Sequence, residues 1–101
     1  MSASAQFDIS DIDRAAREAV GGLSSDAHRL ALQNLKSDTD IFDLLDSFAI
    51  VELLLATETS IEAMVGRYVP LGDESLLDAS KSPLHRFGRW LEYISHAISH
   101  G

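Results

Sequence analysis

The residues best placed to do chemistry are the adjacent pair Asp46 and Ser47, which precede an apolar run free of glycine and proline. This pattern predicts a helix over residues 47–61, with Asp46 as its N-cap. A serine in the first helical turn lies beside unpaired backbone N–H groups and the positive end of the helix dipole. A phosphate ester on Ser47 would be stabilised there, although an Asp-Ser pair is also an ordinary way to cap a helix.

The predicted helix has two apolar sides. At about 100° per residue, one side collects Ile50, Leu53, Leu54, Thr57 and Ile61, and the other collects Phe48, Val51 and Leu55. The first side should pack on the rest of the fold. The second side is flanked by Glu52, Glu58 and Glu62 and is expected to face a partner. The alternative is a central helix that is buried on both sides, for which these glutamates would be awkward.

Other kinds of reactive site find little support. The chain has no cysteine, which excludes disulfides, thiolate metal sites and a catalytic thiol of its own. His96 and His100 could share a helix face as metal ligands, but no cysteine or acid nearby completes a set, so a solvated chain end is favoured. A hydrolase triad around Ser47 would need a nucleophile elbow and alternating strands, and neither pattern occurs. We therefore do not expect an enzyme.

The charge of the chain is concentrated in its centre. The net charge is −8, and residues 37–66 hold seven acids and no Lys, Arg or His. This charge argues against binding to nucleic acid or to anionic lipid. It suggests a face for basic partners, with a solvated acidic surface as the alternative. A small basic patch of His85, Arg86 and Arg89 is interpreted as solvated or paired with Asp78.

Two helical segments are predicted before the central helix. The first has apolar residues at helical spacing, acids at its start and Gly21-Gly22 as its stop; its apolar positions are Ile12, Ala15, Ala16, Ala19, Val20 and Leu23. The second is short and begins at the Ser25-Asp26 cap, with an apolar side made by Ala27, Leu30, Ala31 and Leu35. Residues 41–45 then return apolar side chains to the core.

After the central helix, residues 68–73 have the composition of a loop and residues 74–79 that of a short helical turn. Ser82-Pro83 predicts the start of a last helix, whose core stripe is Leu84, Phe87, Leu91, Ile94 and Ile98. Gly88 should weaken this helix without ending it. The predicted fold is all-α: one domain over 1–101 with three main helices and one or two short ones, and with 1–9 and 97–101 as flexible tails. We expect a cytoplasmic monomer without a signal peptide or membrane insertion.

The run from Phe42 to Leu53 resembles the signature of acyl carrier proteins. In that family an Asp-Ser-Leu triplet opens the second main helix, and a Val-Glu-Leu follows four residues after the serine. Here Asp46-Ser47-Phe48 and Val51-Glu52-Leu53 match in type and spacing. The predicted order of elements is also similar over most of the chain, so the resemblance implies the helical bundle of that family.

The resemblance implies a phosphoprotein that carries acyl groups as thioesters. A phosphopantetheinyl transferase, using magnesium, would move 4′-phosphopantetheine from coenzyme A to Ser47, and Asp46 would help to position the metal and the transferase. The thiol would then sit on the arm, which accounts for the missing cysteine. Partner-binding residues would be Phe48, Val51, Glu52, Leu55 and Glu58. Their partners would be acyl-transferring and synthase enzymes with basic patches, from fatty-acid, lipid or polyketide-type synthesis.

Several positions depart from the family pattern. Leu44 stands where the family usually has glycine, Phe48 replaces leucine, and Ala49 replaces a frequent acid. These departures suggest a specialised carrier rather than a housekeeping one. An aminoacyl or peptidyl carrier and an unmodified helical adaptor remain alternatives. An acyl chain would need an apolar space between the central and closing helices; the alternative is a solid core.

Overall fold

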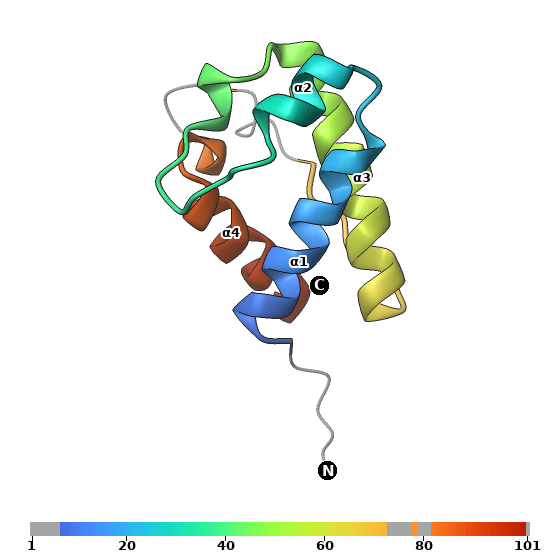
Figure 1. Ribbon diagram of the computed structural model, residues 1–101. Helices are drawn as coiled ribbons and strands as arrows, with labels where there is room; N and C mark the ends of the chain where they lie inside the picture. Colours follow the sequence, from blue (N-terminus) through green and yellow to red (C-terminus); the bar gives the residue numbers. More distant parts are fainter. Residues whose placement is uncertain (1–6, 73–77, 79–81, 101) are drawn as a thin grey trace.

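The computed structural model describes residues 7–72, 78 and 82–100. Its helices are α1 (Ile9–Ala19), α2 (Asp26–Ala31), α3 (Ser47–Val65) and α4 (Phe87–His100). Single 3-10 turns occur at Val20–Gly22, Ile41–Asp43 and Pro83–His85. These residues contain no strand, so the all-α prediction is confirmed for this part of the chain. Figure 1 shows α1 at the front of the bundle, with α4 on one side of it and α3 on the other.

Helix α1 forms as its sequence predicts. Asp8 is the N-cap, and its N–H donates to Asp11 Oδ2 at 3.3 Å, while the Asp11 N–H donates to the Asp8 carbonyl oxygen at 3.0 Å. The predicted apolar stripe is buried along the helix and into the following 3-10 turn. The turn ends at Gly22, where the Gly-Gly pair predicted a stop.

Helix α2 begins at the predicted cap, but none of the residues within the helix is buried. The hydroxyl of Ser25 accepts a hydrogen bond from the His28 N–H at 3.3 Å, as its cap. The predicted apolar side is wrong for the helix itself, because none of its residues is buried and Leu30 is 63% exposed. Of the predicted side only Leu35 reaches the core, from the loop after the helix, and Leu32, which was not predicted, is buried with it. A six-residue helix on the surface contributes little burial, so the chain after it makes the core contact.

Helix α3 is longer than predicted. It runs four residues past Ile61 and ends at Gly66, whose φ of 88° lies in the left-handed region. The Gly66 N–H donates to the Glu62 carbonyl oxygen at 2.8 Å, which closes the helix C-terminus. Its inner side is buried as predicted at Ile50, Leu53, Thr57 and Ile61, and Leu54 is half-buried.

The closing segment is not one continuous helix from Pro83. Ser82 caps the 3-10 turn Pro83–His85, and Arg86 is then extended, with φ −142° and ψ 127°. Helix α4 begins only at Phe87 and continues through His100. The prediction of a tail over 97–101 is therefore corrected for 97–100, where the structure has helix and Ile98 is buried.

The start of α4 is held by the loop that precedes α3. The N–H groups of Phe87 and Gly88 donate to the carbonyl oxygens of Thr39 and Ser37, at 2.9 and 2.8 Å. A Cβ on Gly88 would lie 3.2 Å from the Ser37 carbonyl oxygen, which is tighter than ordinary packing. Gly88 therefore allows this close approach, a role that its sequence position did not reveal.

A single core joins α1, α3 and α4. Every residue of the predicted α4 stripe belongs to this core. The core also contains residues that the helical patterns did not identify: Leu32, Val69, Leu71 and Trp90. The Trp90 ring stacks on Tyr93, with centroids 5.6 Å apart. The expected helical turn at 74–79 lies outside the described residues, apart from Asp78. Across the described part of the chain, no helix has both the length and the apolar character needed to cross a bilayer.

Candidate functional site

Ser47 is the first residue of α3, and its side chain is exposed. Asp46 Oδ1 accepts the Ala49 N–H at 2.8 Å, and the Asp46 carbonyl oxygen accepts the Ile50 N–H at 2.9 Å. These two bonds confirm Asp46 as the N-cap and fix the backbone around Ser47. Among the described residues, the Ser47 hydroxyl forms no hydrogen bond. It is therefore free to receive a group from outside.

The described residues around Ser47 place no base on its hydroxyl. A catalytic serine needs a base within hydrogen-bond reach, and no described histidine or acid bonds to this hydroxyl. The same part of the chain holds no group of three or more His, Cys, Asp or Glu side chains that could bind a metal ion. What the geometry offers is an accessible hydroxyl at a helix N-terminus, where an attached phosphate would meet the positive end of the helix dipole.

An apolar stripe follows Ser47 along the outside of α3. Phe48, Val51 and Leu55 are 74%, 38% and 57% exposed, and the structure places them on one face, as the helical wheel predicts. At 1.5 Å per residue, the stripe extends over about 10 Å. Exposed side chains of this size gathered on one face are typical of a surface that another molecule covers.

Glu52 lies beside this stripe on the side of α1. Its Oε2 accepts a hydrogen bond from the Ser24 hydroxyl at 2.7 Å, and its side chain is half-buried. The loop between α1 and α2 is thereby tied to α3. Because serine is neutral, Glu52 keeps its charge for a partner.

Glu58 is the sequence-predicted site residue that the structure removes from the surface. It is 8% exposed, and its Oε2 accepts the N–H groups of Leu71 and Gly72, at 2.7 and 3.2 Å. Its Oε1 accepts the Tyr68 hydroxyl at 3.3 Å. The expectation that Glu58 meets basic partners is therefore corrected. The chain after Gly66 turns back along α3, and its backbone N–H groups use this carboxylate as their acceptor.

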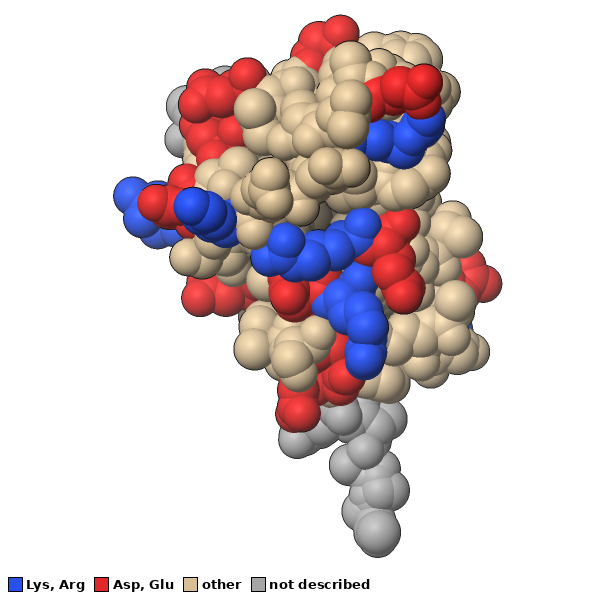
Figure 2. Space-filling view, in the orientation of Figure 1, with Lys and Arg blue, Asp and Glu red and all other residues tan. Residues whose placement is uncertain are grey.

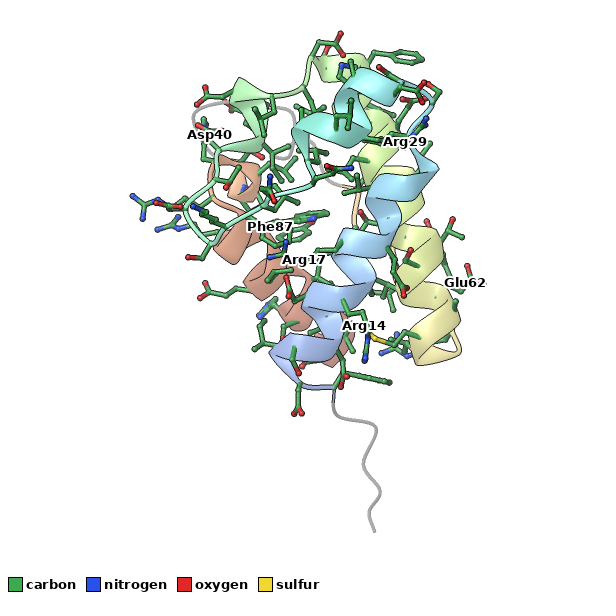
Figure 3. The ribbon with its side chains drawn as sticks, viewed as in Figure 1. Arg14, Arg17, Arg29, Asp40, Glu62 and Phe87 are labelled. Atoms are coloured by element: carbon green, nitrogen blue, oxygen red, sulfur yellow. The ribbon has the colours of Figure 1, made fainter. Side chains whose placement is uncertain are left out.

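Two residues close to Glu58 are exposed where Glu58 is not. Glu62 is exposed, and Figure 3 shows it on the side of α3 away from α1. Tyr68 is 58% exposed and adds an aromatic ring next to Glu58; the sequence had indicated only a loop there. The charge of Glu58, with smaller contributions from burial, their hydrogen bond and Glu62, raises the pKa of Tyr68.

The face over α1 and α2 carries basic side chains interleaved with acids (Figure 2). Arg14 pairs with Asp11 at 2.7 Å and Arg17 with Asp13 at 2.8 Å, and Arg29 pairs with Asp26 (Figure 3). Arg17 also lies over the Phe87 ring, 4.9 Å from its centroid. These arginines serve local structure, and such exposed pairs contribute little to stability.

One residue of the small basic patch, His85, pairs with an acid from another part of the chain. His85 Nδ1 lies 3.0 Å from Asp40 Oδ2, and its ring lies 4.9 Å from the Phe42 ring. Asp40 in turn caps the Phe42 N–H through its Oδ1, at 2.9 Å. The contact of His85 therefore joins the 3-10 turn before α4 to the loop before α3.

Comparison of the chain with models of protein families, with curated proteins and with solved structures finds no match. No family is therefore shown for this chain.

Proposed function

We propose that this protein is an acyl carrier, which holds acyl groups as thioesters on a 4′-phosphopantetheine arm attached to Ser47. The observation that carries the proposal is the exposed Ser47 hydroxyl in the first turn of α3, which bonds to no described residue, with Asp46 before it and the apolar stripe after it. Because the bundle around α3 is fixed by caps and core packing, it would present the arm from a rigid base.

The geometry suits each step that a carrier needs. A separate phosphopantetheinyl transferase would move the arm from coenzyme A to the Ser47 oxygen, which needs only an accessible hydroxyl on this chain. The phosphodiester would lie at the N-terminus of α3, where the helix dipole favours negative charge. Phe48, Val51 and Leu55 would form the apolar centre of the contact with acyl-transferring enzymes, with Glu52 and Glu62 as acids beside it.

An unmodified helical adaptor is the second candidate. The observation that favours it is the 74% exposure of Phe48, because an apolar stripe of this kind can bind a partner without any group on Ser47. An aminoacyl or peptidyl carrier would use the same serine and differ only in its cargo.

Mass spectrometry after incubation with coenzyme A, magnesium and a broad-specificity phosphopantetheinyl transferase tests the proposal. The wild-type chain should gain one arm, and Ser47→Ala should gain none while keeping its helical circular dichroism, because the Ser47 side chain is exposed. Ser10→Ala is the matched control, since Ser10 is an exposed serine in the first turn of α1. An unmodified wild type would favour the adaptor, and modification of Ser47→Ala would refute the assignment.

A further inference from the structure

A groove runs between α1 and α3, beside the apolar stripe, and shares Leu55 with it. Its first part is a hollow of about 470 Å³, lined by Glu18, Ala19, Gly22, Glu52, Leu55, Ala56, Thr59 and Ser60. A second hollow of about 260 Å³ adjoins it and shares Glu18 and Ser60. The two hollows lie in line because α1 and α3 pack side by side (Figure 1).

The groove is hollow because its lining side chains are small. Its lining includes four alanines and one glycine: Ala15, Ala19, Gly22, Ala56 and Ala63. Leu55, which is 57% exposed, forms one wall and also belongs to the stripe. The larger hollow is therefore a mainly apolar recess that adjoins an exposed apolar surface, and a side chain of leucine or methionine size would find contacts on several sides of it. The smaller hollow is more polar, because Asp11, Arg14 and Glu18 line it.

The charge at the rim of the larger hollow is acidic. Its lining contains Glu18 and Glu52 and no Lys, Arg or His. Ser24 orients the Glu52 carboxylate at 2.7 Å without neutralising it. Glu18 forms no ion pair within the described residues, because Arg14, one turn earlier, pairs with Asp11. Two carboxylates at the rim of an apolar recess are complementary to cationic groups that flank an apolar side chain.

We propose that this groove docks an amphipathic helix of a partner protein, which places a leucine- or methionine-sized side chain between lysines or arginines. From Glu52 to Met64 the groove follows α3 for about 18 Å, which corresponds to about three helical turns of an occupant. A third helix packs readily into the furrow between two others. A second copy of this chain is a poor occupant, because its net charge is also −8.

This docking site goes beyond the carrier proposal, because it does not require a modified Ser47. The test therefore uses the full chain with Ser47→Ala, labelled with nitrogen-15, and a helical peptide of about three turns made of leucine and lysine. Two comparison peptides replace all leucines by alanine or all lysines by glutamine. Only the leucine-lysine peptide should shift the amide resonances of residues 18–24 and 52–60.

Variants of the groove locate the contact. Glu18→Gln with Glu52→Gln should weaken binding by about fivefold to twentyfold, as expected for two exposed charge pairs. Asp38→Asn with Glu92→Gln removes the same charge from exposed positions outside the groove and should have little effect. Thr59→Trp should fill the larger hollow and block binding; Thr59 is exposed, so the fold tolerates the change.

Four outcomes would overturn the proposal. These are equal binding of the alanine-lysine peptide, an equal loss in the Asp38/Glu92 control, full binding by Thr59→Trp, and shifts confined to the stripe around Phe48. Shifts that depend on protein concentration without peptide would assign the groove to a second copy instead. Because the transferase assay on wild-type protein is separate, a failure here is distinguishable from a failure of the carrier proposal.

Discussion

Replacing Glu58 by alanine should destabilise the fold far more than its position on a helical wheel suggests. The carboxylate accepts the buried Leu71 N–H at 2.7 Å and the Gly72 N–H at 3.2 Å. Hydrogen bonds to a charged group contribute about 1.5–3 kcal/mol each, and a buried N–H left without a partner costs about 1–3 kcal/mol. Since Gly72 and Tyr68 can regain water, we expect a loss of about 2–4 kcal/mol in the free energy of unfolding.

The destabilisation caused by Glu58→Ala should extend beyond α3, because hydrogen bonds from two elements hold the backbone of Leu71. Its carbonyl oxygen accepts the Tyr93 hydroxyl at 2.8 Å, so the backbone of Leu71 connects α3 to α4. Leu71 and Val69 are both fully buried in the core. Losing the Glu58 acceptor should therefore loosen the segment around Leu71 from both α3 and α4, and the amides of Leu71 and Gly72 should exchange with solvent faster.

Urea denaturation followed by circular dichroism measures the predicted loss, and hydrogen exchange locates it. The matched control is Glu62→Ala, one turn further along α3, where an exposed glutamate should change stability by no more than about 0.5 kcal/mol. The melting temperature of Glu58→Ala should fall by on the order of 15 °C. If Glu58→Ala is too unstable to fold, Glu58→Gln retains one acceptor oxygen and should be intermediate. A Glu58→Ala variant as stable as Glu62→Ala would refute the structural role of this carboxylate.

Three further predictions concern the helix ends and Tyr68. Gly66→Ala should cost about 1–2 kcal/mol because φ is 88° there, whereas Gly21→Ala, with open space and no positive φ, should be neutral or slightly stabilising; equal urea midpoints would contradict this. Asp46→Ala should cost about 0.5–2 kcal/mol through the lost cap, while Asp38→Ala, an exposed acid before it, should not change the midpoint. Because Glu58 raises the pKa of Tyr68, the fold favours the neutral phenol, and this contribution is present below about pH 10 and lost as pH rises through the folded-state pKa. The stability advantage of wild type over Tyr68→Phe should therefore shrink above about pH 10, and a pH-independent difference would contradict it.

Much of the candidate site could be predicted because it depends on neighbours along the chain. The Asp46 cap connects residues three apart, and the exposed stripe from Phe48 to Leu55 follows from the helical period alone. The cap of α2 by Ser25 is likewise local. Such features involve one turn of helix, so residue type and spacing are sufficient to identify them.

Two predictions from the sequence are wrong because the packing of the chain, and not local preference, decides the outcome. A continuous helix from Pro83 agrees with local preference, yet the carbonyl oxygens of Ser37 and Thr39 accept the first N–H groups of α4 and place its start at Phe87. The apolar side of α2 also followed the helical period, but the short helix lies at the surface and Leu32 enters the core after it. Local patterns indicate which residues can form a helix, and packing decides where it begins and what it buries.

The sequence by itself determined the all-α class, the cap that presents Ser47 and the apolar stripe beside it. Only the tertiary structure decided what the flanking glutamates do. Glu58 and Leu71 are 13 residues apart, and Ser24 and Glu52 are 28 apart, yet each pair forms a hydrogen bond of 2.7 Å. A carboxylate on a helical wheel faces water or a backbone N–H depending on which loop folds over it. That choice depends on the packing of the whole chain, because a buried N–H must find an acceptor wherever the fold places one.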